Sequence, residues 1–380
     1  MPVRVAVPKE VVPGERRVAI VPETVVRLKK AGHEVSVESG AGLAAGYTDR
    51  AYTDAGASVA GSGSSALGGA QVVLKVQMPG VREIGRLPSG AVLVGQLNAS
   101  RNLPQVAKLR DAGTTSFSLE LLPRITRAQS MDVLSSQATV AGYRAMLIGA
   151  GLCPKFLPML TTAAGTIRPA KVLVLGAGVA GLMAIATAKR LGALVEAYDV
   201  RRAAGEQVRS LGAKFLELAI NAEAAGGYAR ELTAEEKQQE AEMLARAVEA
   251  ADVIVTTAAI PGRKAPLLVK KEMVDRMHAG AVIVDLAAES GGNCELTVPG
   301  KEVDAHGVTV AGPLNLPSQL PFHASQMYSR NAEAFFGLLL DTGGNLLSEF
   351  TDEILVASLL TRGGSVLHKP TAELLAQGGA

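Results

Sequence analysis

The pattern of hydrophobic and polar positions alternates between short aliphatic runs and longer amphipathic segments. In the first third of the chain it predicts strands at residues 3–7, 35–38, 72–76 and 92–97 and helices at 24–31 and 47–55. Later it predicts strands at residues 171–175, 195–198, 253–257, 282–286 and 308–311. Strands that alternate with helices form parallel sheets with helices on their faces. The pattern therefore predicts an α/β protein with parallel sheets.

Longer helical segments indicate how the chain is divided. A helix at residues 135–152 is expected to lead from one domain into the next, and a charged amphipathic helix at 233–251 is expected to have a solvated face. From about Ser325 the chain is expected to form helices separated by Gly343 and Gly344 that pack back on the first domain. A chain of 380 residues suits two domains. We predict two Rossmann-like domains with a cleft between them, one formed by residues 1–134 and 320–380 and the other by residues 135–319.

A glycine pattern lies between the predicted strand at 171–175 and the apolar helical segment that follows. Gly176, Gly178 and Gly181 have G-x-G-x-x-G spacing. Such glycines provide a tight turn, close approach of the backbone to a pyrophosphate, and close packing of helix on strand. The helix N-terminus adds free N–H groups and the positive end of a dipole. With its strand and helix both present, the pattern predicts a dinucleotide site.

The next strand ends on Asp199, 18 residues after Gly181. A carboxylate at this place can accept hydrogen bonds from the adenosine ribose hydroxyls and would repel a ribose 2′-phosphate. We therefore expect NAD(H) as the cofactor. Arg201 and Arg202 are able to pair with a 2′-phosphate, so NADP(H) stays open as the alternative.

Composition narrows the class of protein. The net charge is +2 and no dense basic run is present, which argues against nucleic acid as the main partner. The two cysteines, Cys153 and Cys294, do not indicate a disulfide framework and favour a reducing cytosol. The apolar run at 172–188 carries the glycine pattern and is short for a membrane span, so we expect a soluble protein. The five histidines show no metal-binding spacing.

The polar segment RITRAQSMDVLS, which begins at Arg124, is the first of three further candidate sites. Gln129, Asp132 and Ser135 can supply the donors and acceptors that a nicotinamide carboxamide needs, and Arg124 can pair with Asp132. The alternative is a surface loop in which Asp132 or Ser130 caps the next helix.

The other two candidate sites lie in NAEAAGGYAR and near the N-terminus. The Gly-Gly-Tyr tip of NAEAAGGYAR, residues 221–230, suits a mobile lid, although an ordinary flexible loop has the same composition. The N-terminal cluster can bind a carboxylate substrate, with one lysine acting as acid or base after a pKa shift, or can form plain salt bridges. Its members are Lys9, Glu10, Arg16, Arg17 and, at a strand end, Lys75.

Several segments together closely resemble the NAD(H)-binding component of proton-translocating nicotinamide nucleotide transhydrogenase. They are RITRAQSMDVLSSQ, AGYRA, GAGVAGLMAIATAKRLGA, YDVR and AGGYA, and the resemblance extends over essentially the whole chain. It implies direct hydride transfer between NADH on this chain and NADP⁺ on a partner subunit, coupled to proton movement. It also implies an NADP(H)-binding subunit, a membrane-spanning subunit, a homodimer, and a cytoplasmic location attached to the inner membrane through the partners.

The resemblance implies roles for individual residues. Arg124 and Asp132 would form a buried pair at the nicotinamide pocket, and Ser135 would help to hold the carboxamide. Gln129 would reach toward the partner's nucleotide, and Tyr228 would lie on a lid. These five form the implied catalytic set. The implied cofactor-binding residues are Arg124, Gln129, Asp132, Ser135, Gly176, Gly178, Val179, Gly181, Asp199, Val200, Arg201, Gly227 and Ala259.

Alanine dehydrogenases, which are related to that component, supply the alternative function. The segments PKE, RRVAIVPE and LNAS resemble their N-terminal pattern, and their substrate-binding residues would fall on Lys75 and Arg17. Their catalytic histidine would fall at Gln96, and glutamine cannot act as an acid or base near neutral pH. A third hypothesis is a regulator that binds NAD without transferring hydride.

Overall fold

The computed structural model describes residues 2–217, 234–259 and 264–377. The chain divides into two compact units, residues 1–137 with 317–380 and residues 138–316. Among the described residues, no helix has both the length and the apolar character that a membrane crossing requires.

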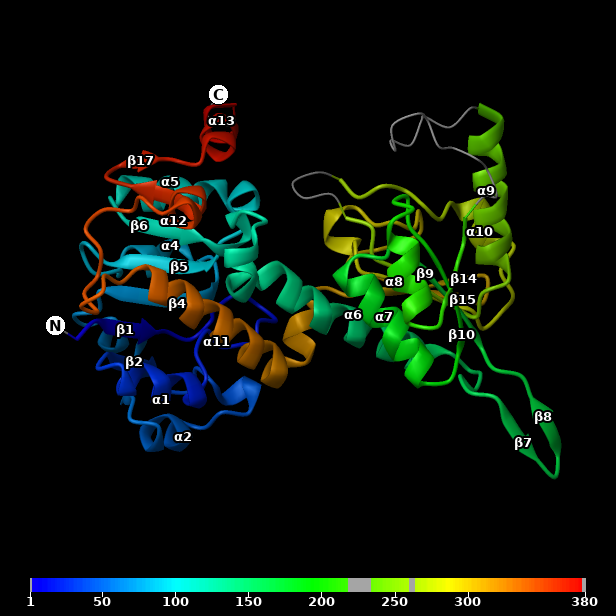
Figure 1. Cartoon of the computed structure of the whole chain (residues 1–380), viewed down its shortest axis with the longest axis horizontal. Helices are drawn as coiled ribbons and strands as arrows, with labels where there is room; N and C mark the ends of the chain where they lie inside the picture. Colours follow the sequence, from blue (N-terminus) through cyan, green and yellow to red (C-terminus); the bar gives the residue numbers. More distant parts are fainter. Residues whose placement is uncertain (1, 218–233, 260–263, 378–380) are drawn as a thin grey trace. The chain divides into compact units, whose positions relative to one another are not determined.

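An eight-stranded sheet forms the first unit (Figure 1). Its strands are β1 (Arg4–Val7), β2 (Glu34–Glu38), β3 (Ser58–Ala60), β4 (Val72–Gln77), β5 (Val92–Gln96), β6 (Thr115–Ser118), β16 (Leu359–Arg362) and β17 (Ser365–Val366). Their order across the sheet is β17-β16-β6-β5-β4-β1-β2-β3. Strands β1 to β6 are parallel, whereas β16 and β17 are antiparallel to their neighbours.

Helices cover both faces of this sheet because successive side chains of a strand point to opposite faces. Val5 and Val7 of β1 belong to one hydrophobic core and Ala6 to the other. Helices of the first core are α1 (Pro22–Lys30), α2 (Asp49–Asp54), α11 (Pro321–Leu338) and α12 (Glu353–Ser358). On the second face lie α4 (Val81–Ile84), α5 (Leu103–Asp111) and α13 (Lys369–Gln377). The short α3 (Gly63–Ala66) follows β3.

A seven-stranded sheet forms the second unit. Its strands are β9 (Lys171–Leu175), β10 (Leu194–Tyr198), β11 (Lys214–Phe215), β12 (Val253–Thr256), β13 (Val282–Asp285), β14 (Glu302–Ala305) and β15 (Val308–Ala311). Their order is β11-β10-β9-β12-β13-β15-β14, and only the edge strand β14 is antiparallel to its neighbour among these described strands.

Two hydrophobic cores flank this second sheet as well. One packs against α6 (Val133–Leu152), α7 (Val179–Arg190) and α8 (Ala204–Ser210), and the other against α9 (Ala234–Glu249) and α10 (Lys271–Val274). The antiparallel ribbon β7 (Leu160–Thr162) and β8 (Gly165–Ile167) extends away from the sheet of its own unit (Figure 1).

Both sheets place their central strands in the same order, with the first strand in the middle and the second and third on one side of it. The order is β3-β2-β1-β4-β5-β6 in the first unit and β11-β10-β9-β12-β13-β15 in the second. This is the doubly wound order, in which the chain changes direction between β1 and β4 or between β9 and β12. Ligands of such sheets bind at the carboxyl ends of the strands at this switch point.

The predicted α/β class with mainly parallel sheets is confirmed. The expectation of helices alone after Ser325 is wrong, because β16 and β17 form an antiparallel hairpin that extends the first sheet. Gly363 and Gly364 connect the two strands with positive φ values of 57° and 77°. A Gly-Gly pair between short strands is typical of a tight hairpin turn, so the sequence contained a signal for it.

Close packing in the second unit depends on a glycine that the sequence analysis did not single out. A Cβ at Gly142 of α6 would lie 2.0 Å from the carbonyl oxygen of Ala180 in α7. Backbone atoms cannot move aside as a flexible side chain does. The two helices therefore approach each other closely because position 142 has no side chain.

We predict that Gly142→Ala lowers the free energy of unfolding by about 1–3 kcal/mol or more, as overpacking does in well-packed interiors. Gly151→Ala is the matched control in the same helix, because a Cβ there meets no atom within 4 Å. That control should be neutral or stabilising by up to about 1 kcal/mol, since alanine favours helix. Urea unfolding checks both variants, and equal midpoints for the two would contradict the packing argument.

Candidate dinucleotide-binding site

Gly176 and Gly181 are required by packing where β9 ends and α7 begins. Gly176 has a φ of +102°, and a Cβ there would lie 2.6 Å from the hydroxyl oxygen of Thr257. A Cβ at Gly181 would lie 1.8 Å from the carbonyl oxygen of Gly176. These two glycines therefore allow a tight turn and close packing of helix on strand, as their spacing predicts.

Gly178 differs from its neighbours, because a Cβ there would meet no atom within 4 Å. It is the N-cap residue of α7, a helix of 12 residues, and its backbone is extended. The first N–H groups of a helix have no partner within the helix, and the dipole there favours an anion. Open space beside such a helix end is what a pyrophosphate group requires.

Asp199 directly follows β10, the neighbour of β9, and its carboxylate bonds to the glycine loop. It accepts hydrogen bonds from the backbone N–H groups of Ala177 at 2.7 Å and Arg201 at 2.8 Å. Nε and Nη2 of Arg201 each donate a further bond of 2.9 Å. Burial works to raise the pKa of Asp199, but the bonds from Arg201 outweigh it and hold the pKa below its usual value. The carboxylate is therefore charged at neutral pH.

A second strand-end carboxylate, Asp285 of β13, was missed by the sequence analysis. It is fully buried and accepts only neutral donors among the described contacts. The donors are Thr256 Oγ1 at 2.8 Å, Ala287 N at 2.9 Å, Asn293 N at 2.7 Å, Cys294 N at 3.0 Å and Thr297 Oγ1 at 2.6 Å. These bonds fix the segment that follows β13. Asp285 ends the aliphatic run VIVD, as Asp199 directly follows a strand, and this position could have drawn attention to it.

Asn293 links the segment that follows β13 to the segment that follows the neighbouring strand β12. Its side chain accepts a bond from the N–H of Ala258 at 3.0 Å and donates one to the Ala258 carbonyl at 2.8 Å. Ala258 follows Thr257, whose hydroxyl donates to the carbonyl of Gly176 at 3.0 Å. A chain of contacts thus runs from Asp285 to the glycine loop. Nothing in the local sequence around Asn293 indicates this role.

The remaining predicted residues of this unit are partly described. Val179 begins α7, Val200 follows Asp199, and Ala259 lies just after β12. All three are exposed, and they lie at the carboxyl ends of the adjacent strands β9, β10 and β12. Gly227, Tyr228 and the rest of the 221–230 segment lie outside the described residues.

In the first unit, Asp132 caps α6. Its carboxylate accepts bonds from the N–H of Ser135 at 2.9 Å and from its hydroxyl at 2.6 Å. The capping alternative for this segment is therefore confirmed for Asp132. Arg124 is exposed and forms no ion pair with Asp132 among the described residues, so the buried pair that the resemblance implied is not present there. Gln129 is exposed on the short 3-10 helix Thr126–Met131.

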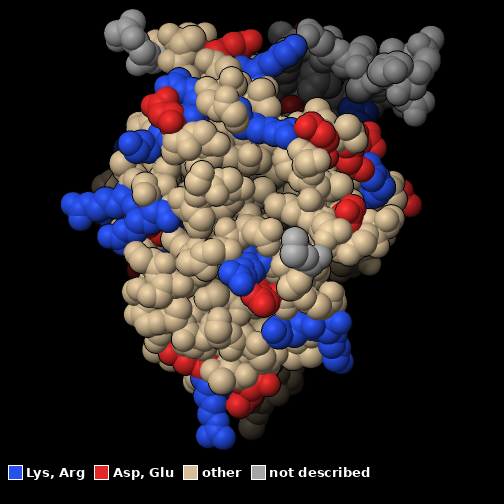
Figure 2. Space-filling model, turned by 90° about the vertical axis from the view of Figure 1, so that its left-hand side faces the viewer, with Lys and Arg blue, Asp and Glu red and all other residues tan. Residues whose placement is uncertain are grey.

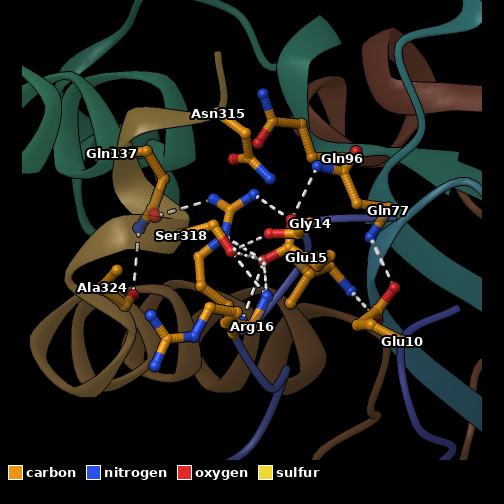
Figure 3. A network of polar contacts seen from close by, with 12 residues as sticks. Glu10, Gly14, Glu15, Arg16, Gln77, Gln96, Gln137, Asn315, Ser318 and Ala324 are labelled. Carbon is orange, nitrogen blue, oxygen red and sulfur yellow. Dashed lines mark hydrogen bonds and ion pairs between the residues drawn. The ribbon is translucent and has the colours of Figure 1, made fainter. Parts of the chain in front are cut away.

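A buried charge cluster occupies the switch point of the first sheet. Arg17 donates to Glu15 through Nε at 2.8 Å and Nη2 at 2.6 Å, and to the side chain of Gln137 at 2.9 Å. Figure 3 shows Glu15 between Ser318 and Gln77, which donate to its carboxylate at 3.0 and 2.9 Å. The salt-bridge alternative for the N-terminal cluster is thus confirmed for Arg17.

Lys75 of β4 is paired in the same way. Its Nζ lies 3.0 Å from Glu83 and 3.5 Å from Glu10. Burial works to lower the pKa of Lys75, but the negative charges of Glu10 and Glu83 outweigh it and raise the pKa. The salt-bridge alternative for the N-terminal cluster is therefore confirmed for Lys75 as well.

Charges on the molecular face drawn in Figure 2 are mixed. Acidic and basic side chains are interspersed around an uncharged central area, and no single sign dominates. This distribution agrees with the small net charge of +2. It gives this face no continuous basic stripe of the kind that binds a nucleic-acid backbone.

Comparison with known proteins places these features in a family. The alanine dehydrogenase/PNT N-terminal domain matches residues 6–141, and the alanine dehydrogenase/PNT C-terminal domain matches residues 145–369. The chain belongs to the alanine dehydrogenase/PNT family. The resemblance inferred from the sequence is therefore confirmed.

Relatives in this family differ in how similar they are to the chain. An NAD(P) transhydrogenase subunit alpha polypeptide of Rhodospirillum rubrum is 48% identical over 96% of this chain and 98% of its own length. A transhydrogenase structure from Sinorhizobium meliloti matches with a TM-score of 0.87 and 45% identity, covering 96% of this chain and 99% of that chain. Alanine dehydrogenase of Mycobacterium tuberculosis is 29% identical over 97% of this chain and 96% of its own length. The chain is thus a homologue of the transhydrogenase alpha subunit and only a distant one of alanine dehydrogenase.

We predict that Glu15→Gln lowers the free energy of unfolding by about 3–5 kcal/mol at pH 7, because a buried arginine loses its carboxylate partner. The side chains of Arg17 and Glu15 are 3% and 0% exposed. Glu333→Gln is the matched control, since the Arg27–Glu333 pair is also held by several bonds but is 43% and 24% exposed. Exposed pairs contribute about 0–1 kcal/mol. Urea unfolding measures both variants. A similar decrease in the free energy of unfolding of Glu15→Gln and Glu333→Gln would contradict a larger contribution from the buried pair.

The same pair predicts a dependence on pH. Burial works to raise the pKa of Glu15, but Arg17 outweighs it and lowers the pKa from 4.5 to about 2. A group with a lowered folded-state pKa stabilises the protein above its unfolded-state pKa, and this contribution is lost as pH falls. The stability difference between the wild type and Glu15→Gln should therefore narrow between pH 4.5 and about 2.

Proposed function

We propose that the chain is the NAD(H)-binding subunit of a proton-translocating, Re/Si-specific NAD(P) transhydrogenase. Hydride would pass directly between NADH on this chain and NADP⁺ on a partner subunit. The observation that supports the proposal is a glycine loop with open space at Gly178 beside the carboxylate of Asp199, in a homologue of the transhydrogenase alpha subunit. The relatives support the family, and the residues at the glycine loop support binding of NAD(H).

The residues of the second unit fit the demands of NAD(H). The N-terminus of α7 and Gly178 would hold the pyrophosphate, and Asp199 would accept bonds from the adenosine ribose. The exposed Val179, Val200 and Ala259 would line the cofactor. The nicotinamide ring supplies or receives the hydride when it is bound. Such transfer needs alignment and exclusion of water but no acid or base.

The residues that the resemblance implies for the nicotinamide end are Arg124, Gln129, Asp132 and Ser135. Asp132 holds Ser135 through two hydrogen bonds, and this would orient Ser135 toward the carboxamide. The exposed Gln129 would reach the partner's nucleotide, and Arg124 would contact the cofactor. Tyr228 and Gly227 would belong to the lid.

We further infer the assembly and location. A single glycine fingerprint provides one dinucleotide site, so a reaction between two nucleotides requires a second chain that binds NADP(H). Proton translocation would belong to a membrane-spanning subunit. The chain would form a homodimer and sit at the cytoplasmic side of the inner membrane, attached through these partners.

Alanine dehydrogenase activity is the alternative. The positions that its substrate residues would take are Arg17 and Lys75, and both are bound to carboxylates of this chain. Gln96, at the position of the catalytic histidine, has no ionisable group near neutral pH. Both observations favour transhydrogenation.

The test combines the purified chain with the soluble NADP(H)-binding component of a transhydrogenase. We expect hydride transfer from NADH to an NADP⁺ analogue, followed by absorbance, only when both proteins are present. Oxidation of NADH by the chain alone with pyruvate and ammonium would support the dehydrogenase instead. Binding of NADH without transfer in either assay would support the regulator.

We predict that Gln129→Asn slows hydride transfer roughly 10- to 100-fold in the reconstituted system, because shortening the side chain alters alignment at the reacting end. The affinity for NADH should stay nearly unchanged, since the pyrophosphate and ribose contacts lie on the second unit. Ser130→Ala, on the exposed neighbouring residue, is the control. A large loss of NADH affinity in Gln129→Asn would contradict a bridging role.

A further inference from the structure

The carboxylate of Asp199 already accepts four hydrogen bonds. A carboxylate offers about four lone-pair sites to donors. Backbone N–H groups take two of them, from Ala177 at 2.7 Å and Arg201 at 2.8 Å. The guanidinium of Arg201 takes the other two at 2.9 Å, with Nε on one oxygen and Nη2 on the other. A ligand that approaches the edge of Asp199 held by Arg201 therefore competes with the guanidinium for the same two oxygens.

Only the two guanidinium bonds can be exchanged readily. The backbone bonds tie the glycine loop and the turn after β10, and their loss would disturb the loop itself. The side chain of Arg201, in contrast, is 63% exposed, while that of Asp199 is 7% exposed. The guanidinium returns to water when the pair opens, and the hydroxyls of a ligand take its place on the carboxylate, so the exchange leaves no unpaired buried charge.

The guanidinium of Arg201 presents its donors in the same arrangement as the two hydroxyls of a ribose. Arginine presents two parallel N–H donors, one to each carboxylate oxygen. The 2′- and 3′-hydroxyls of a ribose are neighbouring donors that can address the same two oxygens. Both groups thus satisfy the same edge of Asp199, and they cannot do so together.

We propose that Arg201 is a displaceable internal substitute for the adenosine ribose, and that NAD(H) binds by exchanging the guanidinium for the ribose hydroxyls on Asp199. This inference rests on the proposed function for the dinucleotide site and adds a competitor to it. Arg201 keeps the buried carboxylate of Asp199 paired before the cofactor binds and competes with the ribose for it. Arg201 therefore lowers the affinity for NAD(H).

A consequence concerns the choice between NAD(H) and NADP(H). A ribose 2′-phosphate has lost one of the two hydroxyl donors and is repelled by the carboxylate. A displaced Arg201 would lie near that phosphate and offset the repulsion. Removal of the arginine should therefore improve binding of NADH and weaken binding of NADPH.

The experiment measures the dissociation constants of NADH and NADPH by fluorescence titration for the purified full-length chain. Arg201→Ala should tighten NADH binding about two- to fivefold, because the ribose hydroxyls no longer compete with the half of the pair that is exposed to solvent. Arg201→Lys should also tighten NADH binding, because a lysine keeps the charge but cannot form the two-pronged bond. The difference between wild type and Arg201→Ala should narrow as salt is raised, since salt screens an exposed pair.

Two controls separate this effect from a general loss of charge. Lys214→Ala removes a cation from another exposed pair of the same unit, with Glu196 at 2.8 Å, and should leave NADH binding unchanged. Asp199→Ala should weaken NADH binding, and adding Arg201→Ala to it should have no further effect, because the two residues act through one interaction.

Weaker NADH binding in Arg201→Ala, with Lys214→Ala unchanged, would overturn the inference, because Arg201 would then hold the cofactor directly. An effect of Arg201→Ala that persists without Asp199 would overturn it as well. Failure of the wild type to bind NADH would instead overturn the proposed function. The titration of the wild type thus tests the proposed function. The ratio of the NADH dissociation constants of variant and wild type tests the exchange of Arg201 for the ribose.

Discussion

The dinucleotide site depends on how closely α7 approaches the end of β9 at Gly181. A Cβ there would lie 1.8 Å from the carbonyl oxygen of Gly176. The hydroxyl of Thr257 donates a hydrogen bond of 3.0 Å to the same carbonyl oxygen of Gly176. This contact fixes the start of the helix directly over the strand end, with open space left at Gly178. The anion-binding character of the helix end is thereby placed at the switch point of the sheet.

The two units share a strand order but fill their switch points differently. In the second unit small residues leave room beside a helix N-terminus. In the first unit the equivalent strand ends carry Lys75 and the buried Glu10, with Arg17 and Glu15 close by in the same network. Paired charged side chains occupy the position where the second unit has its glycine loop. One topology therefore yields an open candidate site for a nucleotide in one unit and a buried ion-pair cluster in the other.

Much of the fold could be predicted because its central strands are aliphatic runs bounded by glycine or polar residues. The glycine loop and Asp199 were found for the same reason, since their spacing is local. Asn293 was missed because its bonds to Ala258 join segments that meet only in the folded sheet. The pairing of Lys75 with Glu83 was missed because the two side chains meet only in the folded first unit. Local patterns predict where strands end, but not which charges meet there.

Three carboxylates of the chain show what makes one of them suited to a ligand. Asp285 is fully buried and satisfied by backbone and hydroxyl donors, which cannot leave without unfolding the segment. Glu15 is buried against an arginine that is itself only 3% exposed, so neither partner can leave. Asp199 alone of the three takes half of its bonds from the exposed side chain of Arg201. A carboxylate that is charged, fixed in place and held by a replaceable donor can exchange that donor for a ligand without exposing an unpaired buried charge.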